Sequence, residues 1–185
     1  MTTPPVFSSG QVLTATQMNS VGIWKTGSQT VGNAVTYVTV SSVFTSDYDN
    51  YKIVYLGGVS SVSAVLFRMQ LEGITGANYY SSGMQQTAIS PTVVTTNVAG
   101  TTVWDLGYTG NQFMRWEIDI SNTSAVGNGK TANVAYSCYD STNSYGGTSA
   151  HWLISGSGTT GFTFAPATGT ISGGQIYVYG YKGPF

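Results

Sequence analysis

Two segments of the chain, 65–71 and 113–120, alternate between apolar residues and residues that are mainly polar. This period of two places alternate side chains on opposite faces of a β-strand. Phe67 and Trp116 fall on the apolar faces of these segments, so we expect both in a hydrophobic core. The two segments are therefore predicted to be strands with one face buried.

Weaker alternation predicts four more strands, at 51–55, 132–138, 162–164 and 176–179. Between them lie short Gly, Ser, Asn and Asp clusters that supply the positive φ of tight turns, at 121–123, 127–129 and 173–174. Short strands at about ten-residue spacing with such turns are typical of a sandwich. We predict an all-β protein, a jelly-roll-like β-sandwich built by residues 22–185. Residues 22–32 are a linker or an entry strand around Trp24.

Residues 1–21 differ from the rest of the chain. Thr14 and Gln17 have the spacing of a capping box, which predicts one short helix over 14–19. The apolar residues of this segment are too few to enclose a core, so we expect them to dock on another protein. The predicted docking residues are Phe7, Val12, Leu13 and Met18.

The low content of charged residues indicates which class of protein this is. Charged residues make up 7% of the chain, against about 25% in an ordinary soluble domain, so hydroxyl and amide side chains must solubilise the surface. That profile is typical of an extracellular or virion protein. The six Lys and Arg residues are scattered and the formal charge is −1, which argues against nucleic acid as a partner. No apolar run approaches the roughly 18 residues of a membrane span.

Reactive side chains are few. The single cysteine, Cys138, lies in an alternating strand pattern and is expected to be a buried thiol. His151 stands beside Trp152, which favours packing or stacking, and no Gly-x-Ser-x-Gly elbow accompanies it. One histidine and one cysteine fall short of a zinc ligand set. We predict no catalytic residues, no cofactor and no metal.

The acidic residues leave two alternatives open. Glu117 and Asp119 share a strand face, as two glycosidase carboxylates might, but Arg115 lies on the same face and favours a solvated, charge-balanced strand. Asp47 and Asp49 fit either a calcium loop or the turn into the strand near residue 51. A calcium loop needs more acidic ligands and a glycine, so we favour the turn.

Aromatic residues are the richest feature, with 13 tyrosines in 185 residues. Tyrosine and tryptophan offer rigid amphipathic area, which suits both binding surfaces and β-sandwich cores. Four tyrosines stand among Ser, Gly and Asn, in stretches that we interpret as exposed loops. These candidate ligand or receptor contacts are Tyr79, Tyr80, Tyr139 and Tyr145.

Three segments resemble proteins of tailed bacteriophages. Residues 6–19, Val-Phe-Ser-Ser-Gly-Gln-Val-Leu-Thr-Ala-Thr-Gln-Met-Asn, resemble the amino-terminal segment of tail and fibre proteins. Residues 44–51, Phe-Thr-Ser-Asp-Tyr-Asp-Asn-Tyr, resemble the opening of a strand in a family of short phage structural proteins. Residues 173–181, Gly-Gly-Gln-Ile-Tyr-Val-Tyr-Gly-Tyr, are similar to that family's closing strand.

The resemblance implies a β-sandwich component of the virion, often a homotrimer, anchored to other virion proteins by its amino-terminal segment. The expected function is a short tail fibre or receptor-binding module that contacts a host-surface glycan. The alternative is a decoration, or cement, protein of the capsid or neck that recognises no host. A third hypothesis, a polysaccharide-degrading enzyme, depends on Glu117 and Asp119.

Overall fold

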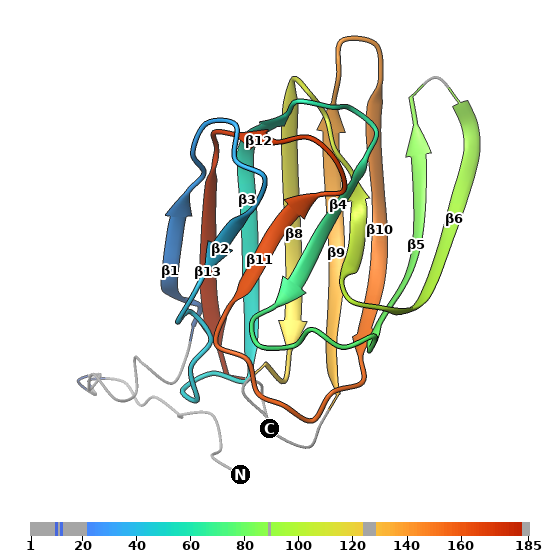
Figure 1. Ribbon diagram of the computed structural model, residues 1–185. Coiled ribbons are helices and arrows are strands. Elements are labelled where there is room, and N and C mark those ends of the chain that lie inside the picture. The colour runs from blue at the N-terminus through green and yellow to red at the C-terminus, as the bar shows by residue number, and fades with distance from the viewer. Residues whose placement is uncertain (1–9, 11, 13–21, 89, 124–128, 183–185) are drawn as a thin grey trace.

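The computed structural model describes residues 10, 12, 22–88, 90–123 and 129–182. Its larger, nine-stranded sheet is antiparallel throughout (Figure 1). In spatial order its strands are β1 (Trp24–Thr30), β13 (Gln175–Tyr181), β3 (Asn50–Ser60), β8 (Phe113–Ser121), β9 (Lys130–Tyr139), β10 (Ser144–Leu153), β5 (Tyr79–Thr87) and β6 (Ser90–Thr101), and the short β12 (Ile171–Ser172) pairs with β3.

A second antiparallel sheet of four strands covers one face of the first. Its strands in spatial order are β2 (Val38–Val40), β11 (Phe162–Pro166), β4 (Leu66–Leu71) and β7 (Trp104–Tyr108). Figure 1 shows this sheet in front of β3, β8 and β9, with β6 beyond it at one edge. The protein is therefore all-β with two facing sheets, as predicted, and the far face of the larger sheet is free of the smaller one.

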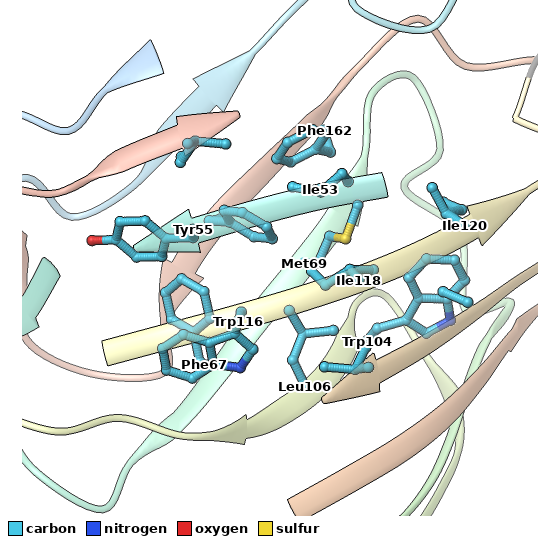
Figure 2. Close-up of a cluster of buried hydrophobic side chains, with 14 of the residues drawn as sticks. Ile53, Tyr55, Phe67, Met69, Trp104, Leu106, Trp116, Ile118, Ile120 and Phe162 are labelled. Carbon is cyan, nitrogen blue, oxygen red and sulfur yellow. The ribbon is translucent and has the colours of Figure 1, made fainter. Parts of the chain in front are cut away.

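Aromatic rings from both sheets meet in the core. Trp116 on β8 lies opposite Tyr55 on β3 and Tyr136 on β9 in the strand register. Its ring centroid is 6.3 Å from that of Tyr55 and 5.8 Å from that of Tyr136. Phe67, from β4 of the smaller sheet, approaches Trp116 to 4.4 Å (Figure 2). Phe67 and Trp116 are fully buried, which confirms both as core residues.

The six predicted strands are all present, as parts of β4, β8, β3, β9, β11 and β13. Of the two readings of residues 22–32, the entry strand is correct, because β1 spans Trp24–Thr30 and pairs with β13. The described residues contain no helix. The helix predicted over 14–19 lies outside the described residues.

The turns follow the chemistry of their residues. Gly173 and Gly174 have φ of 68° and 84°, and Asn122 has φ of 61°, so the positive φ predicted at 173–174 and at 121–123 is present. Residues 127 and 128 of the third predicted turn lie outside the described residues. Asp47 lies in an exposed turn and Asp49 just ahead of β3. The turn interpretation of these two acids is therefore confirmed.

Candidate functional site

His151 sits between the two sheets in a chain of hydrogen bonds. Its Nδ1 lies 2.9 Å from the Ser81 hydroxyl and its Nε2 lies 2.7 Å from the Ser149 hydroxyl. The Asp105 N–H donates to the Ser81 hydroxyl, and the Ser149 hydroxyl donates to the Leu106 carbonyl. The histidine thus connects β5 and β10 of the larger sheet to β7 of the smaller one.

One tautomer uses all four of these contacts. Because Ser149 donates to Leu106, it must accept from His151, so Nε2 carries the proton. Nδ1 then accepts from the Ser81 hydroxyl. Burial lowers the pKa of His151 to about 4, which keeps the ring neutral at pH 7. In this arrangement His151 donates to Ser149 and packs in the core, where its ring centroid lies 5.6 Å from that of Trp104. The predicted packing of His151 is present, but Trp152 faces the other side of the sheet and is not its partner.

The outer face of the larger sheet, away from the smaller sheet, carries the other candidate site. The strand register aligns Asp119 on β8, Asn133 on β9, Ala150 on β10, Ser82 on β5 and Asn97 on β6 in one row across the sheet. A neighbouring row contains Glu117, Ala135, Thr148, Met84 and Thr95. Strands distant in sequence therefore build one polar surface.

This surface is hollowed where its side chains are small. A hollow of about 640 Å³ spans the two rows from β8 to β6. Ala135, Ala150 and Ser82 do not fill the space above the sheet, whereas Glu117 and Met84 are among its larger lining residues. A second hollow of about 440 Å³ adjoins the first and shares Ser82, Asn97 and Ala150 with it. We call the two hollows together the outer-face groove.

Charged groups at the β8 side of the groove are paired. Lys52 Nζ, from β3, lies 3.3 Å from Asp119 Oδ2 and 3.6 Å from Glu117 Oε2. Arg115 forms an ion pair with the other oxygen of Glu117. The hydrogen bond from Arg115 is the main reason that the pKa of Glu117 is below its usual value. The charge-balanced strand predicted from Arg115, Glu117 and Asp119 is confirmed.

Two aromatic side chains line one side of the groove, on the neighbouring strands β10 and β5. Trp152 on β10 lies directly opposite Tyr80 on β5, and both line the second hollow. Trp152 is 54% exposed although it is the largest kind of apolar side chain. Gly129 makes room for it, because a Cβ at that position would lie 2.6 Å from Trp152 Nε1. An exposed indole is thus positioned beside a polar groove.

Two of the four predicted contact tyrosines are not at the surface, and that part of the prediction is wrong. Tyr79 is fully buried: its hydroxyl donates to the Ile74 carbonyl, and burial raises its pKa to about 12. Tyr145 is 8% exposed and donates to the Asp140 carboxylate. Both tyrosines belong to strands, in which neighbouring residues face opposite ways, so a tyrosine in a polar stretch can still point into the core.

The other two tyrosines reach the surface. Tyr139 is 47% exposed at the end of β9, outside the lining of the groove, and Tyr80 is half-buried within it. Of the predicted docking residues, Val12 is 85% exposed. Phe7, Leu13 and Met18 lie outside the described residues.

Cys138 is buried and its thiol contacts the Tyr108 carbonyl, so the predicted buried thiol is confirmed. Burial is the main reason that its pKa rises to about 12. No group of three or more His, Cys, Asp or Glu side chains that could hold a metal ion occurs among the described residues. The described part of the chain also contains no helix suited to crossing a membrane.

Sequence reasoning missed most of the groove. It considered Trp152 only as a packing neighbour of His151, and it did not identify Asn97 or Asn133. The usable signal was alternation within 144–153, where Thr148, Ala150 and Trp152 share the exposed face of β10. Comparison with protein-family models, with curated proteins and with solved structures finds no match to this chain.

Proposed function

We propose that this protein is a non-enzymatic virion component of a tailed bacteriophage, a short tail fibre or receptor-binding module, and that its outer-face groove binds a glycan of the host surface. The phage assignment rests on the three segments at 6–19, 44–51 and 173–181 that resemble phage structural proteins. The glycan assignment rests on the groove. The virion is the proposed location, and other virion proteins are the proposed partners of residues 1–21.

The observation that carries the glycan proposal is the exposed Trp152, paired with the half-buried Tyr80, beside a polar hollow. One face of a pyranose ring presents C–H groups that stack on aromatic rings, while its hydroxyls need hydrogen-bond partners at the edge of the ring. The groove offers both features in adjoining hollows. Trp152 and Tyr80 share the second hollow with Asn97, so an aromatic surface and an exposed amide lie in one site.

The proposal that the protein is not an enzyme is supported by the contacts of its acidic side chains and of His151. A glycosidase needs one carboxyl that stays protonated to act as an acid. The pKa of Glu117 is lowered, and Lys52 pairs with both Glu117 and Asp119. His151 is a hydrogen-bond donor to Ser149 in a buried network. These groups favour binding over bond cleavage.

The first prediction concerns attachment. We expect that deleting residues 1–21 leaves a cooperatively folded β domain that no longer joins the particle. Within the described residues the first strand begins at Trp24 and the buried hydrophobic core begins at Val31, so the deletion leaves every described strand in place. Burying apolar side chains such as Leu13 is worth roughly 1.5 to 3 kcal/mol each, enough for a few of them to anchor a copy. Calorimetry of the truncated protein and its level in assembled particles measure the two effects.

A point variant separates docking from folding. Leu13→Asp is expected to reduce incorporation strongly while changing the free energy of unfolding by no more than about 0.5 kcal/mol, because the arm assignment keeps residue 13 out of the sandwich core. Leu13→Met is the matched control and keeps incorporation. A truncated chain that does not fold would contradict the arm assignment and place residues 1–21 in the sandwich core.

A decoration protein of the capsid or neck is the alternative within the same class. A density map of the particle, at a resolution sufficient to locate the sandwich, distinguishes the two. We expect copies at the tail tip, and copies on the head lattice would overturn the receptor-binding proposal. The proposed homotrimer is tested separately by light scattering, since a stable monomer at micromolar concentration contradicts it outside the virion.

A further inference from the structure

The ionisable groups of the groove cancel one another. Glu117 and Asp119 are matched by Lys52 and Arg115, and these four contact one another in a continuous network. The two hollows are otherwise lined by polar and apolar side chains and by His151, which burial keeps neutral. An anionic sugar would find no excess cation here, and a metal ion would find no excess carboxylate.

The groove nevertheless contains side chains that can form hydrogen bonds with a ligand. Asn97 and Asn133 are exposed residues of the groove lining, and their side-chain amides make no hydrogen bond within the described residues. Each amide offers two donor hydrogens and one acceptor oxygen. Lys52 forms an ion pair with Oδ2 of Asp119. The other oxygen, Oδ1, remains as an acceptor beside Asn133, which is in the same row. Neighbouring sugar hydroxyls, which both donate and accept, match this set.

The groove is too long for one sugar. Its lining crosses the five strands from β8 to β6, and a neighbour spacing of about 4.8 Å gives a length of about 19 Å. The aromatic pair lies at one side, two residues along the strands from the row of Asp119, Asn133 and Asn97. A ligand that uses both regions must therefore be an oligosaccharide.

We infer that the outer-face groove selects an uncharged oligosaccharide, held without a metal ion, with one sugar stacked on Trp152 and Tyr80 and its neighbours hydrogen-bonded to Asn97, Asn133 and Asp119. This inference rests on the proposed glycan-binding function and specifies its ligand. The paired charged side chains act as fixed hydrogen-bond acceptors and donors. Because their charges cancel, they exert no long-range electrostatic attraction on a ligand.

The experiment uses the full-length protein and immobilised oligosaccharides in matched sets: neutral hexose, deoxyhexose and N-acetylhexosamine chains, and the same chains carrying sialic acid, uronic acid or sulfate. We expect retention on neutral chains only. The affinity should change less than about twofold between 50 and 500 mM NaCl, because no net charge is neutralised on binding. Addition of EDTA should leave it unchanged.

Point variants test whether the oligosaccharide binds in the groove. Trp152→Ala is expected to weaken binding at least about tenfold, as for a buried aromatic contact in other interfaces. Asn133→Ala should weaken it severalfold. The matched control is Tyr37→Ala, which removes an exposed aromatic side chain outside the groove lining and should leave affinity unchanged.

The possible outcomes distinguish the inference about the ligand from the broader proposal that the protein binds a glycan. Binding to anionic chains that weakens with salt, or binding lost with EDTA, overturns the neutral, metal-free ligand but keeps glycan binding if Trp152→Ala abolishes it. Retention on no glycan overturns both the inference and the glycan-binding function. Neutral-chain binding that survives Trp152→Ala and Asn133→Ala places the site elsewhere and overturns the inference.

Discussion

Replacing Trp116 with alanine is expected to lower the free energy of unfolding by about 3 to 5 kcal/mol. Trp116 is fully buried, lies between Tyr55 and Tyr136 within the larger sheet, and contacts Phe67 of the smaller sheet. Its removal leaves a cavity where the two sheets meet. Since domains of this kind are stable by about 5 to 15 kcal/mol, the loss is a large fraction of the total. Urea unfolding followed by circular dichroism measures it.

Trp116→Phe is the matched control. The Trp116 Nε1 atom is buried and has no hydrogen-bond partner among the described residues, so phenylalanine loses area but no hydrogen bond. We expect a cost below about 1.5 kcal/mol, as for moderate changes of core shape. A loss of under about 1 kcal/mol in the alanine variant would contradict the placement of Trp116 at the centre of the core.

Acidification is expected to destabilise the protein by about 3 kcal/mol through His151 alone. Its pKa is about 4 when folded and about 6.5 when unfolded, so the unfolded state takes up the proton first. The stabilisation is complete above pH 6.5 and is lost progressively as the pH falls towards 4. Urea unfolding at a series of pH values between 7 and 4 measures this loss.

His151→Gln isolates the effect. The variant is less stable at pH 7, because the contacts to Ser81 and Ser149 change, but its stability should be nearly constant between pH 6.5 and 5. Glu117 and Asp140 do not interfere in that window. Hydrogen bonds lower their pKa values from 4.5 and 3.8, so their stabilisation is lost only at lower pH. Parallel pH profiles for the wild type and the variant would contradict a buried neutral histidine.

The strands that sequence predicted are those whose buried face is apolar. In β8 the inward residues are Met114, Trp116, Ile118 and Ile120, and alternation shows this directly. In β10 the inward positions include Ser149 and His151, which are polar but satisfied by hydrogen bonds. Hydrophobicity does not indicate burial there, so the sequence predicts no strand at β10 or at its partner β5, and Tyr79, Tyr80 and Tyr145 are interpreted as loop residues.

The tyrosine errors and the missed groove have the same cause. Tyr79 and Tyr80 are adjacent, and only their place in β5 shows that one faces the core and the other the groove. The groove draws Asp119, Asn133 and Asn97 from three strands, and these residues align only through the register of the sheet. Pairing between distant strands is not encoded in local alternation, so the residues were recognisable singly but not as a site.

Calorimetric titration of the isolated protein with neutral bacterial envelope polysaccharides tests the central claim most directly, because it measures groove binding itself. The comparison is between the wild type and Trp152→Ala, whose exposed side chain lies outside the core. We predict saturable binding to the wild type, weakened at least about tenfold in the variant with an unchanged melting temperature. Equal binding by the two proteins, or no heat from either at high polysaccharide concentration, would contradict the outer-face groove as a glycan site.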